Sequence, residues 1–213
     1  MKKIALTLFI GFSLASCGQD NAPLSDETAA VQDTVPTAYF GSGCFWCSEA
    51  IFETIDGVYE VESGYAGGEV EDPTYSQVCS GTTGHAETVK VYYDSSIVSY
   101  ETLLEVFFNS HDPSTLNQQG PDSGTQYRSV AFYQDTIEKK AISAYIEYLK
   151  NENIHPSIST TIEALGTFYM AEEYHQDYVK NNLNRSYVQN VSKPRMFKFL
   201  EKMPSFKKDN PFE

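Results

Sequence analysis

Two cysteines, Cys44 and Cys47, stand three residues apart and follow a short segment that contains Gly41 and Gly43. If a helix begins here, Cys44 lies beside exposed backbone N–H groups and the positive end of the helix dipole, which both favour a thiolate. Residues one helical turn apart are also close enough for a disulfide. The spacing therefore predicts a pair of thiols that can be oxidised reversibly.

The same cysteines also have interpretations without redox chemistry. A structural zinc site would need two more ligands, for which Cys79 and His85 are the only nearby candidates, and the chain has no second CxxC or HxxxH pair. Two buried, unreactive cysteines on one helix are the other alternative. We expect neither a metal nor a bound cofactor.

A carboxylate, Glu87, falls on the apolar side of a predicted strand, where it alternates with Val89, Val91 and Tyr93. Burial disfavours the charged form, so it raises the pKa of a carboxyl and keeps it protonated near neutral pH. A protonated carboxyl can give its proton to an oxygen that leaves another atom. The alternative is a glutamate on an edge strand that simply reaches water.

The predicted strands and helices follow one another without a steady βαβ rhythm. We predict strands at 37–42, 57–65, 85–93, 127–133 and 157–165, and helices at 44–55, 99–109, 136–150 and 171–181. Residues 110–126 form a long polar loop, and the tail from 182 to 213 is expected to be irregular and polar. The mixture predicts an α+β fold, a two-layer sandwich with helices packed on a mixed β-sheet.

The first 17 residues have the pattern of an export signal. A short basic start precedes a nine-residue apolar run at 4–12, whereas a membrane-spanning helix needs about 20 residues. Leu14, Ala15 and Ser16 lead to Cys17 in a sequence that looks like a bacterial lipobox. We predict a lipoprotein signal peptide that ends at a lipid-bearing Cys17; the alternative is an ordinary signal peptide cut near Ala15.

Residues 18–35 carry four acidic and no basic side chains, with few large apolar ones, and are predicted to be a flexible acidic tether. Residues 36–213 are long enough for one compact domain. The net charge of −14 argues against nucleic acid as a partner and against electrostatic attachment to a membrane. We therefore expect the lipid on Cys17 to hold the protein at a membrane of the cell envelope, on the periplasmic or outer-surface side.

Several motifs in a fixed order, between about residues 39 and 178, resemble the peptide methionine sulfoxide reductase A family. They are Gly43–Trp46, Tyr75–Glu87, His111–Asn117, Gln119–Ser129 and Phe168–Gln176. The resemblance implies a two-layer α+β core of ferredoxin-like (plait) type. It also implies reduction of (S)-methionine sulfoxide in oxidised proteins or peptides, with a thioredoxin-like dithiol as reductant; free methionine sulfoxide stays open as a second substrate.

The same resemblance assigns roles to the candidate residues. It implies that Cys44 attacks the sulfoxide sulfur and that Glu87 protonates the departing oxygen. Tyr75 and Tyr127 match the positions whose hydroxyls hold that oxygen, although a chain with 15 tyrosines has most of them elsewhere for packing. After methionine leaves, Cys44 would be a sulfenic acid, which condenses readily with a neighbouring thiol.

The substrate pocket is assigned in the same way. Phe45 and Trp46 match the apolar pocket for the substrate methyl group, and Asp122 matches a polar position of that pocket. His85 and His175 also match the motifs, and we interpret both as hydrogen-bonding parts of the scaffold.

The chain departs from the family in its resolving cysteine. Many members carry such cysteines in a C-terminal tail, but residues 180–213 contain none. Cys47 replaces a glycine that often follows Phe-Trp, and its one-turn distance from Cys44 makes it the expected resolving thiol. Cys79 is expected to be buried and structural, but remains the alternative partner.

Two other functions stay open from the sequence alone. A CxxC at a helix start is also typical of thioredoxin-like disulfide oxidoreductases, although these lack a partner such as Glu87. A binding lipoprotein without catalytic activity is the third hypothesis.

Overall fold

The computed structural model describes residues 35–206 and residue 208. The predicted signal peptide, the lipid-bearing Cys17 and all but the last residue of the predicted tether lie outside this part. Within it, no helix has the length and apolar character that a membrane span requires.

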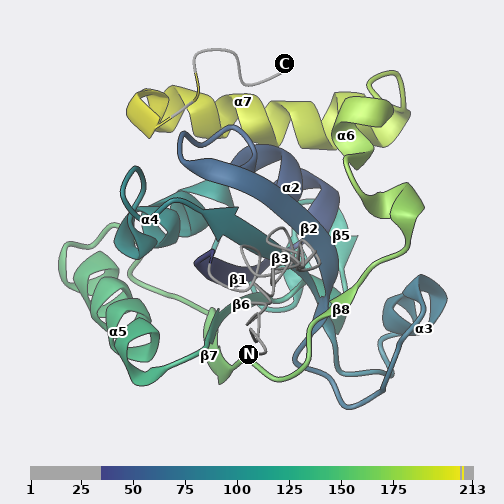
Figure 1. The fold of residues 1–213 in the computed structure, drawn as a ribbon, viewed down its shortest axis with the longest axis horizontal. Helices are drawn as coiled ribbons and strands as arrows, with labels where there is room; N and C mark the ends of the chain where they lie inside the picture. Colours follow the sequence, from purple (N-terminus) through teal and green to yellow (C-terminus); the bar gives the residue numbers. More distant parts are fainter. Residues whose placement is uncertain (1–34, 207, 209–213) are drawn as a thin grey trace, which may run out of the picture. The chain divides into compact units, whose positions relative to one another are not determined.

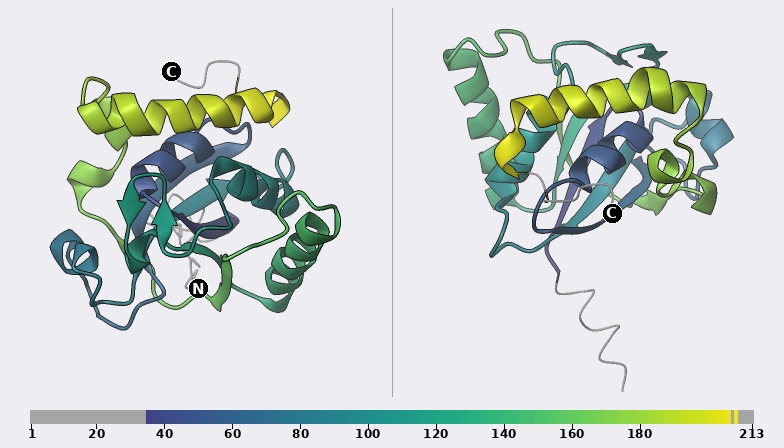
Figure 2. Two further views of the ribbon diagram at one scale, coloured as in Figure 1. Left: turned by 180° about the vertical axis from the view of Figure 1, so that it is seen from behind. Right: turned by 90° about the horizontal axis from the view of Figure 1, so that it is seen from above.

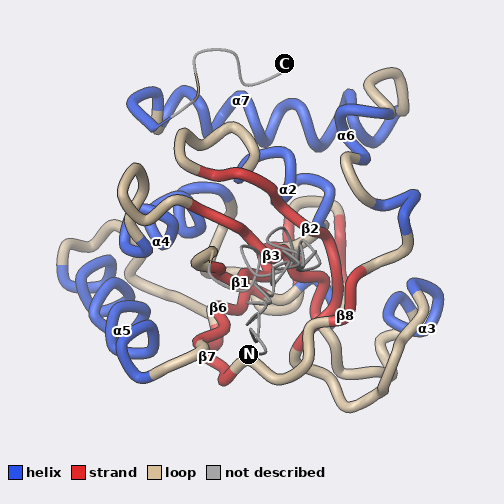
Figure 3. Tube along the Cα trace, in the orientation of Figure 1, coloured by secondary structure: helices blue, strands red, loops and turns tan. Residues whose placement is uncertain are grey.

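A six-stranded sheet forms the centre of the described domain (Figures 1 and 3). Its order is β7-β6-β1-β3-β2-β8, and every neighbouring pair is antiparallel except the parallel pair β6–β7. The strands are β1 (Thr37–Ser42), β2 (Val58–Ala66), β3 (Ala86–Tyr93), β6 (Ser129–Tyr133), β7 (Thr161–Ala164) and β8 (Tyr169–Met170). The sheet is mixed and helices pack on it, so the predicted α+β class is confirmed.

The helices lie in two shells over one face of the sheet. α2 (Phe45–Phe52) and α4 (Tyr100–Ser110) pack directly on the strands, and α5 (Thr136–Asn151) packs beside α4. α7 (Lys193–Lys202) packs across the outside of α2 and α4 (Figure 2). Two short helices, α3 (Tyr75–Cys79) and α6 (Tyr178–Asn181), and a two-residue hairpin, β4 (Gln118–Gln119) with β5 (Asp122–Ser123), complete the domain.

The core fills the space between the sheet and α2 and α4. Phe40 of β1 stacks on Phe52 of α2 and on Phe107 of α4, with ring centroids 5.3 and 4.9 Å apart. Val89 and Val91 of β3 point into the same core and are fully buried. Because side chains alternate along a strand, Glu87 is directed to this buried face as well. The predicted pattern of β3 is confirmed.

The C-terminal tail is the main error of the sequence interpretation. Residues 188–202 are helical throughout, as a π-helical turn (Val188–Ser192) that continues into α7. The physical reason is an apolar stripe on a polar segment: Met196, Phe199 and Met203 recur at helical spacing and are buried.

Smaller differences concern element bounds. The strand expected at 157–165 is only Thr161–Ala164, and the helix expected at 171–181 is a 3₁₀ turn followed by α6. Asp177 has a left-handed φ of 51° between these two pieces and interrupts the helix. The unpredicted helix α3 is started by a capping box between Thr74 and Gln77.

Candidate active site

The two cysteines lie at the turn from β1 into α2. Gly43 takes a left-handed φ of 82°, and a Cβ added there would come within 2.4 Å of the Gln119 Cβ, so the turn requires glycine. Cys44 is the N-cap of α2, and its carbonyl accepts hydrogen bonds from the N–H groups of Cys47 and Ser48 at 3.1 and 3.3 Å. This turn brings the thiols of Cys44 and Cys47 into hydrogen-bonding contact. Both are free and buried.

The pKa values of the two thiols of the reduced pair shift in opposite directions. Burial raises the pKa of the Cys44 thiol, and the neighbouring Cys47 and Glu87 raise it further. The hydrogen bond from Cys44 and the positive charge of Arg195 lower the pKa of Cys47 to about 6. Ser192 Oγ, 3.3 Å from Cys47 Sγ, contributes a further hydrogen bond. The hydrogen bond from Cys44 is the largest of these effects on the Cys47 pKa, and the Arg195 guanidinium adds to it.

Glu87 is buried beside the start of the same helix. Its side chain is 1% exposed, and Oε2 accepts a 2.9 Å hydrogen bond from the backbone N–H of Phe45. Burial raises the pKa of Glu87 to about 8, and the charges of Asp122 and Cys47 act in the same direction. The carboxyl is therefore mostly protonated at neutral pH. Because β3 is an interior strand, the alternative of an edge-strand glutamate that reaches water is wrong.

The hydroxyls of Tyr75 and Tyr127 lie within electrostatic reach of that carboxyl. Burial raises the pKa of both phenols, and the charge of Glu87 raises each further. The Tyr127 hydroxyl is also influenced by Cys44. Both phenols therefore stay protonated as potential hydrogen-bond donors near Glu87, and Tyr127 is also near Cys44.

Aromatic rings enclose the other side of the site. Trp46 stacks on Tyr178 with ring centroids 3.6 Å apart and an interplanar angle of 8°. Its indole N–H donates a 3.0 Å hydrogen bond to His175 Nδ1, which fixes the ring. Phe45 is buried, with its centroid 5.1 Å from that of His175. Phe45 and Trp46 therefore present a rigid apolar wall next to Cys44.

Asp122 lies on the hairpin strand β5 and is half-buried. Its Oδ2 accepts a hydrogen bond from the hydroxyl of Tyr187, and burial raises its pKa. The same Tyr187 hydroxyl hydrogen-bonds the Cys44 thiol, and the ring packs edge-on against Trp46 at 5.7 Å. Tyr187 thus connects three predicted site residues, although the sequence interpretation missed it together with the tail that carries it.

Arg195 of α7 is the second missed residue. Its Nε donates to the carbonyl of Ser110 at 2.7 Å, and Nη2 donates to Ser42 Oγ at 3.1 Å. These bonds hold the guanidinium at the ends of α4 and β1, close enough to Cys47 to stabilise its thiolate. The tail carries seven basic side chains, and nothing in the local sequence distinguishes Arg195 from the other six.

Of the remaining candidates, the two histidines have the expected scaffold contacts, whereas Cys79 is not buried as expected. His85 accepts from the Gly68 N–H at Nδ1 and contacts the Val70 carbonyl at Nε2, so its predicted scaffold role is confirmed. His175 holds Trp46, as expected of a scaffold residue. Cys79 is exposed rather than buried, because the five-residue helix α3 buries only Val78. No group of three or more potential metal ligands occurs among the described residues.

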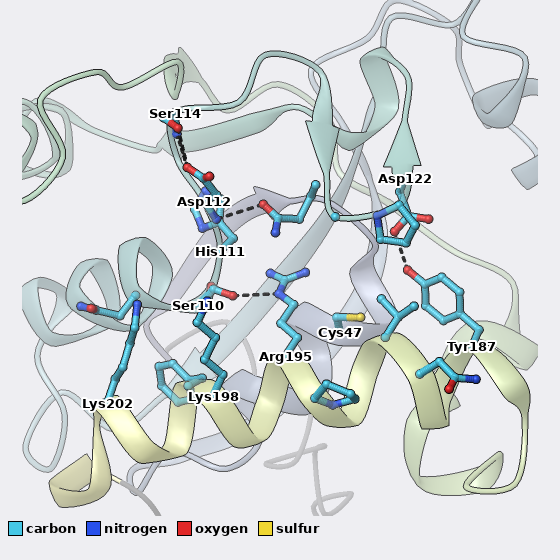
Figure 4. Close-up of a pocket in the computed structure, with 18 of the residues that line it drawn as sticks. Cys47, Ser110, His111, Asp112, Ser114, Asp122, Tyr187, Arg195, Lys198 and Lys202 are labelled. Atoms are coloured by element: carbon cyan, nitrogen blue, oxygen red, sulfur yellow. Dashed lines mark hydrogen bonds between the residues drawn. The ribbon is translucent and has the colours of Figure 1, made fainter.

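Two hollows adjoin the site. One, of about 650 Å³, is lined by residues that include Cys47, Asp122, Tyr187 and Arg195 (Figure 4). The other, of about 580 Å³, is lined by aromatic residues that include Trp46, Tyr75 and Tyr178. Ligands can therefore approach the site from two directions.

Comparison with known proteins gives a consistent result. Residues 36–208 match the family described as peptide methionine sulfoxide reductase. A protein of Natronomonas pharaonis named peptide methionine sulfoxide reductase MsrA is 54% identical over 161 residues, which cover 75% of this chain and 90% of the relative. A protein of the same name from Nautilia profundicola is 47% identical over 167 residues, covering 78% and 95%.

Solved structures agree with the sequence relatives. Mxr1 from Saccharomyces cerevisiae in reduced form superposes with a TM-score of 0.67 at 35% identity, over 70% of this chain and 87% of that chain. Methionine sulfoxide reductase A of Corynebacterium diphtheriae gives 0.62 at 34% identity, over 69% and 74%. A thioredoxin-like oxidoreductase and a non-catalytic binding protein are thereby set aside. The chain belongs to the peptide methionine sulfoxide reductase A family.

Proposed function

We propose that this protein reduces (S)-methionine sulfoxide in oxidised proteins and peptides to methionine. The observation that carries the proposal is the position of Glu87, whose neutral carboxyl is hydrogen-bonded to the residue next to Cys44. A sulfoxide oxygen is a poor leaving group until it is protonated. The reaction also needs a thiolate to attack the sulfur. A thiol pair with one negative charge supplies this nucleophile, and the uncharged carboxyl of Glu87 supplies the proton.

The first step needs a thiolate on Cys44. Cys47, whose pKa is lowered to about 6, accepts the Cys44 proton through the hydrogen bond between them. Cys44 then attacks the sulfoxide sulfur while Glu87 protonates the oxygen. Tyr75 and Tyr127 donate hydrogen bonds to that oxygen. The hydroxyl of the resulting adduct then passes to the Cys44 sulfur as the bond between the two sulfurs breaks, so that methionine departs and Cys44 is left as a sulfenic acid.

The second step makes Cys47 the resolving residue. Its thiol attacks the Cys44 sulfenic acid, so that a disulfide forms and water leaves. The two sulfurs already touch, whereas the Cys79 thiol hydrogen-bonds Tyr75 from α3. We propose a thioredoxin-type dithiol as the reductant that restores the pair.

The substrate methyl group is expected to lie against Phe45 and Trp46. Asp122 is the proposed acceptor for a polar group of the substrate, since its carboxylate already accepts from Tyr187. Bound substrate would then displace the Tyr187 hydroxyl from Asp122, from Cys44 or from both.

We also propose that a lipid on Cys17 anchors the protein in the cell envelope. The basic start, the short apolar run and the Leu-Ala-Ser-Cys sequence support this. Cells grown with labelled palmitate should yield labelled protein, and Cys17→Ser should abolish the label and release the protein from membranes. An unlabelled wild-type protein would contradict the anchor.

The resolving role of Cys47 predicts a specific oxidation product. After one equivalent of a methionine sulfoxide peptide without reductant, mass spectrometry should show the loss of two hydrogens, mapped to a Cys44–Cys47 bond. Cys47→Ser should still release one equivalent of methionine, although more slowly because Cys47 no longer takes the Cys44 proton, and should accumulate a Cys44 sulfenic acid that dimedone traps. Cys79→Ser is the matched control and should behave as wild type; a Cys44–Cys79 bond would overturn the assignment.

The acid role of Glu87 predicts the pH dependence of chemistry. Since the acid acts only when protonated, the single-turnover rate of methionine release should fall as the pH rises through about 8. Glu87→Gln should lower the rate at pH 7 by about 10²-fold or more, the range of general acid catalysis, and lose this decline.

Glu49 provides the matched control, because it is a second buried glutamate on α2 whose pKa burial raises to about 8. It accepts from Ser63 and lies outside the site. Glu49→Gln should keep the rate and the pH profile of wild type. A Glu87→Gln protein as fast as wild type would refute the acid role.

A further inference from the structure

The 650 Å³ hollow borders one cysteine of the pair. It lies between α7 and the segment that carries the β4–β5 hairpin, and Cys47 lines it whereas Cys44 does not (Figure 4). Both cysteine side chains are nearly covered, with total exposures of 1% for Cys47 and 6% for Cys44. A reductant that enters this hollow therefore meets Cys47.

One side of the hollow is a cationic stripe. Arg195, Lys198 and Lys202 follow one another at i, i+3 and i+7 on α7, and all three line the hollow. None of them is in a salt bridge with a carboxylate of residues 35–206 or 208. The chain as a whole is acidic, with 29 acidic and 15 basic side chains. Three such cations beside a redox cysteine therefore make this part of the surface differ in charge from the rest.

The other charges of the hollow do not cancel this stripe. Asp112 is bonded to the N–H and hydroxyl of Ser114, and Asp122 accepts from Tyr187. Burial and the charge of Arg195 lower the pKa of His111 to about 3, so that it is neutral. Two carboxylates with partners thus face three cations, of which Lys198 and Lys202 are exposed at the rim.

We propose that this hollow binds a low-molecular-weight thiol that carries carboxylates, and that this thiol reduces the Cys44–Cys47 disulfide by attacking Cys47. The inference rests on the proposed function, since it concerns the disulfide that function creates, and it adds a second route for electrons beside a thioredoxin-type dithiol. The volume fits, because small-ligand pockets typically enclose about 300–1,000 Å³.

The exchange balances as two thiol steps. The thiolate of the reductant attacks Cys47 Sγ, the bond to Cys44 breaks, and Cys44 leaves as a thiolate that takes up a proton. A second reductant thiolate then attacks the reductant sulfur of the mixed disulfide, and Cys47 leaves. Two thiols become one disulfide, and the protein gains two electrons. Because a thiol of low pKa departs faster, the lowered pKa of Cys47 favours the second step, whereas the raised pKa of Cys44 makes the first step the slower one.

A charge series of small thiols tests the proposal. The oxidised protein is mixed with mercaptosuccinate, 2-mercaptoethanol or cysteamine, and reduction is followed by the fluorescence of Trp46, the single tryptophan of the chain, which stands beside Cys47. Rate constants are expressed per thiolate. We expect mercaptosuccinate to react about tenfold faster than 2-mercaptoethanol and cysteamine to be slowest, with a difference that shrinks as salt screens the cations.

Variants assign the effect to the stripe. Lys198→Gln combined with Lys202→Gln should reduce the ratio of the mercaptosuccinate to the 2-mercaptoethanol rate constant to about one. Lys193→Gln, on the same helix but outside the hollow, is the matched control and should keep the ratio. Equal rate constants for all three thiols in the wild type, or an unchanged ratio in the double variant, would overturn the proposal.

Failure of the proposed function would look different. Pre-reduced protein mixed with a methionine sulfoxide peptide would then release no methionine, whatever the thiol series shows.

Discussion

The hydrogen bond from the Phe45 N–H to Glu87 is the contact on which the site depends. It links the first residue of α2 to an interior strand and holds the carboxyl within reach of Cys44. Burial there favours the neutral acid by more than the N–H favours the carboxylate, so the pKa of Glu87 is raised to about 8. The packing of β3 against the start of α2 therefore buries Glu87, which keeps it protonated, and also places it near Cys44.

The second constraint is that one negative charge is shared by two buried sulfurs. The hydrogen bond from Cys44 lowers the pKa of Cys47 to about 6, and Arg195 and Ser192 of the C-terminal helical segment add to this effect. Cys44 remains the protonated partner until Cys47 takes its proton. The C-terminal segment therefore contributes electrostatics and the Tyr187 hydroxyl, although it contains no cysteine.

Local patterns in the sequence were sufficient for the α+β class and for the positions of the cysteines and of Glu87. The period-two pattern of β3 and the glycine turn before α2 depend on neighbouring residues only. The prediction for the C-terminal tail failed because charged residues separate the apolar residues of α7 in the sequence. Its contacts are also with residues far away in the chain: Arg195 donates a hydrogen bond to Ser42, 153 positions earlier. The exposure of Cys79 and the opposite pKa shifts of Cys44 and Cys47 likewise depend on tertiary packing.

The ionisation of Glu87 is the most direct test of this account. In reduced protein labelled with ¹³C at the glutamate carboxyls, the resonance absent from Glu87→Gln can be assigned and titrated by NMR. We predict a midpoint near pH 8, which leaves an uncharged acid beside the thiol pair at neutral pH. A midpoint near 4.5, the ordinary value, would mean that the carboxylate is charged at neutral pH and has no proton to give.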